Sequence, residues 1–125
     1  MFINFSYTSY KEWPEDQIKA AREYGEIVDF LFPEVSADAD ETEIEEMADE
    51  CGREIYEALE ECGTDANAVL VEGEYTLTFS LVNRLKELNI GALSAGLEKH
   101  DMESTDSNGN KIKESYYIFK RFREY

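Results

Sequence analysis

Two glutamates flank a glycine where a predicted strand runs into a predicted helix, Glu72 and Glu74 in the stretch AVLVEGEYTLTF. In open α/β proteins such a junction often binds a phosphate, because the backbone N–H groups that begin the helix attract anions. Two carboxylates would instead suit a divalent cation, or one could act as a general base on a ribose 2′-hydroxyl. The alternative is structural: Glu74 complements the helix dipole, and Glu72 meets solvent or Arg84.

Three loops supply the other candidate site residues. The carboxyl ends of neighbouring parallel strands meet at one edge of a sheet, so side chains in the loops that follow them face a common crevice. These loops offer hydroxyl groups, tyrosine rings suited to stacking on a base, and a few charges. The residues that we expect at the site are Ser6, Tyr7, Thr8 and Ser9, then Glu72, Gly73, Glu74, Tyr75 and Thr76, then Ser94, Ala95 and Lys99.

The sequence lacks the motifs of the common cofactor and metal sites. It contains no G-x-x-x-x-G-K-[ST] and no G-x-G-x-x-G, so we expect neither a P-loop nor a dinucleotide site. His100 is the only histidine, and it falls in a polar segment that we expect to be a solvated loop. We therefore expect no metal ion, no cofactor and no Ser–His–Asp triad.

The elements that position these loops alternate between strands and helices. Apolar runs predict strands, and apolar residues three and four apart predict helices. Asp38 with Glu41 and Asp40 with Glu43 both resemble capping boxes at the start of the long second helix. The expected strands cover residues 2–6, 27–32, 67–71, 90–95 and 115–125, and the expected helices cover residues 14–24, 38–62 and 76–88.

Residues 96–114 show no helical periodicity, and DSNGN within them is a turn signal. With only a loop between them, the last two strands should form an antiparallel hairpin. The order βαβαβαββ predicts a single Rossmann-like α/β domain over residues 1–125. Its sheet should be mostly parallel, with helices on both faces and an antiparallel C-terminal edge strand.

The charge is strongly acidic and unevenly distributed. The formal net charge is −17; residues 1–83 hold 22 acidic and 4 basic side chains, whereas residues 84–125 hold 7 and 8. This excess argues against binding duplex nucleic acid, although a small anionic ligand remains compatible with the less acidic half. Because neither an apolar run of membrane-spanning length nor a secretory signal is present, we expect a cytoplasmic protein without a membrane partner.

The C-terminal segment KRFREY alternates cations with aromatic residues. The pattern is compatible with nucleic-acid contact, but charged residues also protect an edge strand or a subunit interface, and we favour that second interpretation. If this strand runs antiparallel to the preceding one, Lys113, Tyr116 and Tyr117 should lie near the crevice. Arg123 and Tyr125 should then lie at the opposite end.

Several of these segments together resemble a known group of proteins. The stretches INFS, YGEIVDFLFPEV, VEGEYTLTFSLVNRLKELNI and FKRFREY are similar in order and spacing to small CRISPR-associated accessory proteins. These are single-domain, Rossmann-like relatives of the CARF domain, several of which bind or degrade cyclic oligoadenylate second messengers.

The resemblance implies a homodimer with a two-fold pocket for a cyclic oligoadenylate, and a metal-independent ring nuclease in which a ribose 2′-hydroxyl attacks the adjacent phosphate. It implies that Ser6–Ser9 and Gly73–Thr76 hold phosphate and adenine, and that Ser94, Lys99 and Lys113 close the site. Glu74, Thr76 and Ser6 would be the catalytic residues. The chain departs from this pattern in charge, because few cations lie in the expected pocket of so acidic a protein.

Two alternatives remain open. The protein could bind the messenger without cleaving it, as a sponge or a sensor. It could also be a protein–protein interaction module whose acidic helix, residues 38–61, docks on a basic partner. Product formation separates the first alternative from the nuclease, and neutralising that helix tests the second.

Overall fold

The computed structural model describes residues 1–125 and holds one five-stranded sheet in the order β2-β1-β3-β4-β5. The first four strands are parallel, and β5 pairs antiparallel with β4. This confirms the predicted α/β class with its antiparallel edge strand. The elements are β1 (Phe2–Ser6), η1 (Tyr10–Glu12), α1 (Glu15–Arg22), β2 (Ile27–Leu31), α2 (Glu41–Cys62), β3 (Ala68–Val71), α3 (Tyr75–Glu87), β4 (Gly91–Thr105) and β5 (Lys111–Glu124).

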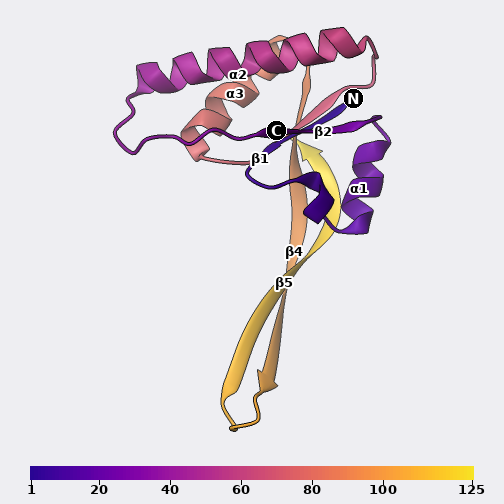
Figure 1. Ribbon diagram of the computed structural model, residues 1–125, viewed down its shortest axis with the longest axis vertical. Helices are drawn as coiled ribbons and strands as arrows, with labels where there is room; N and C mark the ends of the chain where they lie inside the picture. The colour runs from indigo at the N-terminus through magenta and orange to yellow at the C-terminus, as the bar shows by residue number, and fades with distance from the viewer.

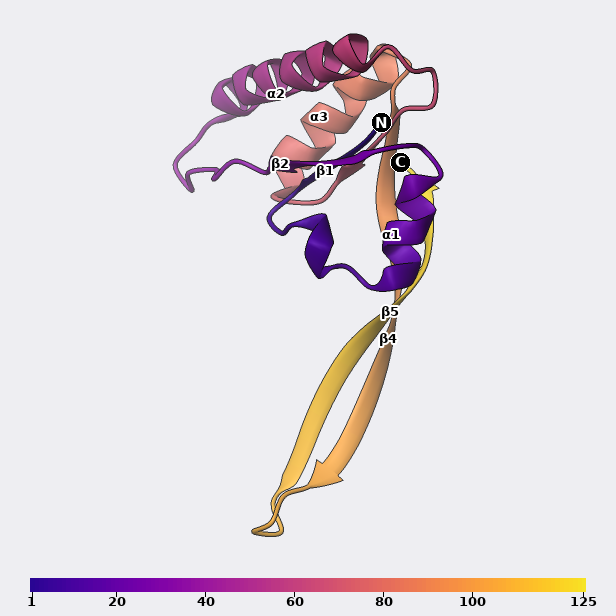
Figure 2. The same ribbon diagram turned by 45° about the vertical axis from the view of Figure 1, so that its right-hand side comes forward.

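Helices cover both faces of the sheet and create two cores. Helices α2 and α3 pack on one face, and α1 packs on the other (Figures 1 and 2). The α2/α3 side holds a cluster of 15 buried residues, and the α1 side holds a cluster of 6. Strands β1 and β3 are buried at every residue, which agrees with the uninterrupted apolar run that predicted a central position for β3.

The helix ends follow capping chemistry. Asp40 caps α2, because its Oδ1 accepts a hydrogen bond of 2.9 Å from the N–H of Glu43. Of the two predicted capping boxes, only this one is used, so α2 begins at Glu41 and not at residue 38. Gly63 ends α2 with a φ of 68°, and Asn89 follows α3 with a φ of 58°. Both adopt the left-handed conformation that commonly ends a helix.

Arg84 joins the two helices on the larger core. Its guanidinium forms ion pairs with Glu45 and Asp49 of α2 and donates to the carbonyl of Ser80, one turn earlier in α3. These contacts raise the pKa of Arg84 above its ordinary value and lower the pKa of Glu45 below its ordinary value. Because Arg84 pairs with two carboxylates of α2, the alternative in which Glu72 meets Arg84 is wrong.

The largest difference from the prediction lies in the last two strands. Residues 96–114 are not a loop: β4 continues to Thr105, β5 begins at Lys111, and only Asp106–Asn110 form the turn. The predicted turn itself is confirmed, since Asp106 Oδ1 accepts hydrogen bonds from the N–H groups of Asn108 and Asn110 and Gly109 has a φ of 80°. The strands were missed because they leave the body of the protein, and solvated strands lack the burial pattern that identifies a strand.

No helix is long and apolar enough to cross a membrane.

Candidate functional site

The strand order creates a crevice between the carboxyl ends of β1 and β3, where successive connections diverge to opposite faces of the sheet. In this protein the crevice is filled by its own side chains. The Tyr7 hydroxyl accepts a hydrogen bond of 3.2 Å from the N–H of Glu74, which ties the loop after β1 to the loop after β3. The ring of Phe32, whose centroid lies 5.1 Å from that of Tyr7, packs beside this contact.

Gly73 is needed for this closure. A Cβ at Gly73 would lie 2.4 Å from two ring carbons of Phe32, and Phe32 is itself 2 % exposed. The resemblance implied that Gly73–Thr76 hold phosphate and adenine. In the structure, the Phe32 ring lies against the backbone of Gly73.

Glu74 explains why a negative charge is tolerated at the junction between β3 and α3: it caps the helix. Its carboxylate accepts hydrogen bonds from the N–H groups of Thr76 and Leu77, at 3.0 and 2.9 Å, and from the Thr76 hydroxyl. The backbone N–H of Leu77 first, and then the Thr76 hydroxyl, lower the pKa of Glu74. The carboxylate therefore occupies the place at the start of α3 where a phosphate would bind.

The loop after β1 is held by a buried polar network. Asn4, 1 % exposed, donates from Nδ2 to the Thr8 carbonyl and to Asp29 of β2, and its Oδ1 accepts from the Ser6 hydroxyl at 2.8 Å. The Ser9 hydroxyl donates to Asp29 as well, at 2.7 Å. Burial raises the pKa of Asp29, but these hydrogen bonds outweigh it, so the pKa is lowered overall. Ser6, Thr8 and Ser9 thus make intramolecular bonds that shape the loop.

The open site lies next to this filled crevice, between α3 and the C-terminal residue. A pocket of about 580 Å³, which we call the C-terminal pocket, opens there. Two aromatic rings on the exposed side of α3 stand out, since Tyr75 is 90 % exposed and Phe79 is 70 % exposed. The lining residues are Glu72, Gly73, Tyr75, Thr78, Phe79, Val82, Asn83, Lys86 and Tyr125.

The chain terminus forms the wall of this pocket opposite α3. The hydroxyl of Tyr125 donates to the Val71 carbonyl at the end of β3, at 2.6 Å. Burial first raises the pKa of Tyr125 and the charge of Glu72 raises it further, while a hydrogen bond with Ser94 opposes them. Glu72 accepts from the N–H of Ala95 at 3.0 Å, which fixes the carboxylate between β3 and β4. These contacts place Tyr125, Ser94 and Glu72 together at the carboxyl edge of the sheet.

The register of β5 brings cations to the same edge and corrects a prediction. Arg123 lies opposite Ser94 and Arg121 opposite Gly96, so both follow the face of Tyr125 by strand alternation. Lys113 lies opposite Glu103, far out on the hairpin. The predicted positions are therefore reversed: Tyr125, just after β5, reaches the carboxyl end of β3, and the beginning of β5 lies away from it. The cause is the extension of β4 to Thr105, which shifts the whole antiparallel register.

The comparisons with known proteins can be set beside this geometry. The profile of the family described as "Uncharacterized protein MJ1673 family" matches residues 1–123. The chain belongs to this family. No curated protein and no solved structure matches the chain.

The MJ1673-family chain brings together only part of the predicted site. Glu72, Gly73 and Tyr75 line the C-terminal pocket, and Ser94 and Ala95 contact its wall. Among the others, Lys99 lies on the extended hairpin 3.9 Å from Asp101. No group of three or more histidine, cysteine or acidic side chains is arranged to hold a metal ion.

Sequence reasoning missed the pocket residues Phe79, Asn83 and Lys86 of this MJ1673-family protein. A signal for them was present. They follow Tyr75 at intervals of three and four residues, which places all four on one side of a helix and off the stripe of leucines that packs on the sheet. Because only the ends of strands were considered as site positions, this exposed side of α3 was not predicted to contribute.

The cap of α3 yields a prediction for this MJ1673-family protein. Replacing Glu74 with alanine should lower the free energy of unfolding by about 1 kcal/mol at neutral pH, because two N–H groups lose their acceptor. Since folding lowers the Glu74 pKa from its ordinary 4.5, the carboxylate stabilises the protein fully above that value. The stabilisation is lost as the pH falls through the lower folded value.

Urea unfolding of wild type and Glu74→Ala at neutral pH and at about pH 3 measures this effect. The difference between the two proteins should shrink at the lower pH. Glu57→Ala, at an exposed position of α2, is the control and should change little at either pH. A Glu74→Ala protein as stable as wild type at neutral pH would contradict the capping role.

Proposed function

We propose that this protein binds a cyclic oligoadenylate, with a base and a phosphate of the ligand in the C-terminal pocket. The observation that carries the proposal is the presence of two exposed aromatic rings and a lysine in one pocket. Tyr75 and Phe79 offer rings on which adenine can stack, and Lys86 supplies a charge in the pocket. Arg123 adds a guanidinium opposite Ser94.

The volume and the local charge also support a nucleotide-sized ligand. A pocket of about 580 Å³ falls in the range of small-molecule sites. The acidic helix α2 packs on the side of α3 that carries Arg84, whereas the pocket lies on the side that carries Lys86. One pocket accommodates one base and one phosphate of a cyclic oligoadenylate, and the rest of the ring lies outside it.

Cleavage of the ring is the second part of the proposal. Holding a ribose 2′-hydroxyl in line with its phosphate supplies much of the rate of such an intramolecular attack. Glu72 is the carboxylate that lines the pocket, while Glu74 and Thr76 bond to each other at the start of α3. We therefore assign the general base to Glu72 in preference to Glu74. Attack by the 2′-oxygen on phosphorus would expel the 5′-oxygen and leave a cyclic phosphate end.

Calorimetric titration with cyclic tetraadenylate and cyclic hexaadenylate tests binding. Liquid chromatography with mass spectrometry, with and without manganese, tests for linear products that carry a cyclic phosphate. Binding without products would support the sponge or sensor, and products that persist in Glu72→Gln would remove Glu72 as the base. If neither ring is bound or cut, the proposal is wrong.

The aromatic contact gives a specific prediction. Phe79→Ala should weaken the binding of the cyclic oligoadenylate by about tenfold, because one base loses its stacking surface. Tyr56→Ala removes another exposed ring, on α2 and outside the pocket, and should leave the dissociation constant unchanged. Equal losses in the two variants would place the ligand elsewhere.

A further inference from the structure

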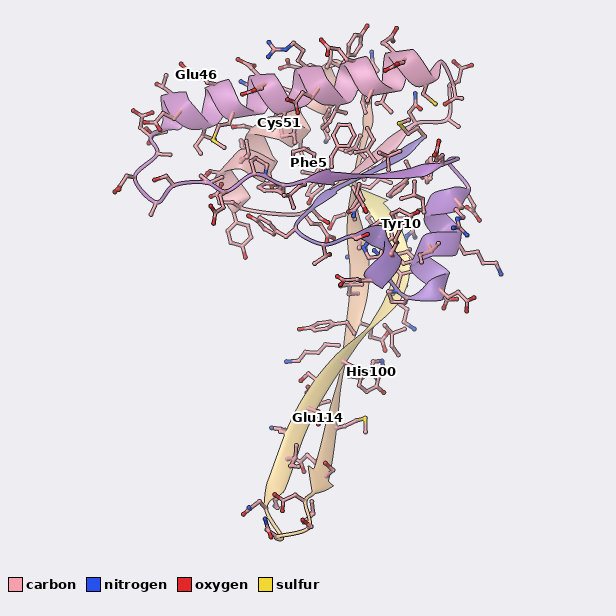
Figure 3. The ribbon with its side chains drawn as sticks, viewed as in Figure 1. Phe5, Tyr10, Glu46, Cys51, His100 and Glu114 are labelled. Atoms are coloured by element: carbon pink, nitrogen blue, oxygen red, sulfur yellow. The ribbon has the colours of Figure 1, made fainter.

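The extended hairpin forms an arm that packs on no other part of the chain. Beyond Gly96, β4 and β5 leave the body together, and residues 98–118 project away from all three helices (Figures 1 and 2). Phe119, at the base of the arm, is 8 % exposed and packs on Phe122 of the body. At about 3.3 Å per residue the arm is about 30 Å long. Its labelled side chains, His100 and Glu114, lie far from the cores (Figure 3). A two-stranded ribbon alone in water is only marginally stable. We therefore expect an arm of this length to pack against a partner.

One face of the arm, which we call the charged face, carries most of its charged side chains beside the exposed side chains of Leu97 and Tyr117. Asp101 Oδ1 accepts a hydrogen bond of 2.7 Å from the Ser115 hydroxyl across the ribbon. Lys99 lies 3.9 Å from the same carboxylate, and Glu103 lies opposite Lys113. Opposite charges that lie near one another on one face in this way are typical of a face that stays in water.

The opposite face, which we call the apolar face of the arm, carries Ile118, Tyr116, Met102 and Ile112. Tyr116, Met102 and Ile112 are 44, 52 and 37 % exposed. The ring of His100 stacks on that of Tyr116, with centroids 5.3 Å apart and an interplanar angle of 16°. Contiguous apolar side chains on a surface mark an interaction site.

The charges around this face indicate which classes of partner it does not bind. Its acidic side chains are Glu98, which pairs with Lys120 at 3.4 Å, and Glu114. Because the one lysine at this face, Lys120, is paired with Glu98, the apolar face has no free cation to bind the phosphates of a nucleic acid or a lipid headgroup. A basic protein would find a far stronger attraction at α2, which holds ten acidic residues and one arginine.

We propose that the apolar face of the arm binds the same face of a second copy of this chain, with the two arms antiparallel about a two-fold axis. The pattern is self-complementary. Ile118 lies at the base of the arm, Met102 and Ile112 lie towards the tip, and the His100–Tyr116 stack lies between them. Antiparallel docking therefore sets Ile118 of each copy against Met102 and Ile112 of the other, as an isologous interface requires. It also brings Glu114 near the partner's Glu98, whose charge Lys120 offsets at 3.4 Å.

Net charge favours this surface over any other for self-association. Two chains of formal charge −17 repel, and contact through the body would bring two acidic α2 helices together. Contact through the arms keeps these helices apart, because the arm projects away from α2 (Figures 1 and 2). One ribbon face of this length gives a total interface of about 1,000 Å², at the low end for specific complexes, so the dimer should dissociate on dilution.

Adjacent tyrosines on opposite faces of the arm provide a matched test by analytical ultracentrifugation. Tyr116→Lys, on the apolar face, should weaken dimerisation by at least tenfold, because it sets a cation against the partner's apolar side chains. Tyr117→Lys, on the charged face, should leave the dissociation constant of the dimer within about twofold of wild type. Equal effects of the two variants would overturn the proposal. So would a wild-type chain that stays monomeric into the submillimolar range.

Cross-linking tests the geometry independently of stability. In a Cys62→Ser background, Met102→Cys should give a disulfide-linked dimer on mild oxidation, because the proposed axis passes near the middle of the apolar face. Glu103→Cys, one residue further along and on the charged face, should give none. Cross-linking of Glu103→Cys but not of Met102→Cys would place the interface on the wrong face. Both tests are made without a ligand, so their outcome is separate from that of the proposed function.

Discussion

Gly73→Ala should destabilise the protein by about 2–3 kcal/mol, the largest effect that we expect from adding a single methyl group. The new Cβ would lie 2.4 Å from the Phe32 ring, a distance that real contacts do not reach. The ring has little room to retreat, because Phe5 packs against it from within the core, with centroids 5.3 Å apart. Either Phe32 leaves its position or the loop after β3 moves away from the loop after β1.

Urea unfolding with a matched glycine and a double variant measures this effect. Gly91→Ala is the control: its Cβ would meet only the Asn67 carbonyl, at an ordinary 3.7 Å, so it should cost much less. In the background of Phe32→Leu, a smaller side chain, Gly73→Ala should cost less than it does alone. Additive losses in the double variant would show that the two residues do not compete for space.

Reversing two charges should remove most of the proposed ligand affinity. In Lys86→Glu/Arg123→Glu, the dissociation constant for the cyclic oligoadenylate should rise about 100-fold, because each cation is expected to supply a hydrogen bond to phosphate. The loss should be greatest at low ionic strength, where charges act over the longest range. Calorimetric titration at two salt concentrations measures both effects.

The control carries the same change in net charge on the opposite face of the sheet. Lys19→Glu/Arg22→Glu alters two exposed residues of α1, far from the C-terminal pocket. If the proposal is right, this control weakens binding by no more than a few fold through the long-range field. Equal losses in the two double variants would show that only net charge matters, and the pocket would lose its role.

The two glutamates that flank Gly73 prove to have different positions. Glu74 turns back onto α3 and occupies the anion site at the start of the helix. Glu72 reaches the N–H of Ala95 and lines the C-terminal pocket. The junction that the sequence pointed to therefore has two roles. Glu72 and Gly73 line the C-terminal pocket beside the exposed side of α3, and the backbone of Glu74 joins the loop after β3 to Tyr7.

The sequence by itself determined the kinds of element and their order, because those depend on local chemistry. The apolar run of β3, the Asp40–Glu43 cap and the Asp106–Asn110 turn each act within a few residues. Rules of chain connection then lead from that order to a mostly parallel sheet. The class of fold followed without knowledge of any contact distant in the sequence.

Only the tertiary structure decided the place of the site and the presence of the arm. Arg123 lies opposite Ser94 because β4 runs to Thr105, and a solvated ribbon of this length shows no alternation of apolar residues from which it could be predicted. The closure of the crevice depends on Phe32 meeting Gly73, residues from different strand ends that become neighbours only when β2, β1 and β3 align. Register and packing are properties of pairs of segments distant in the chain, so no pattern within one segment determines them.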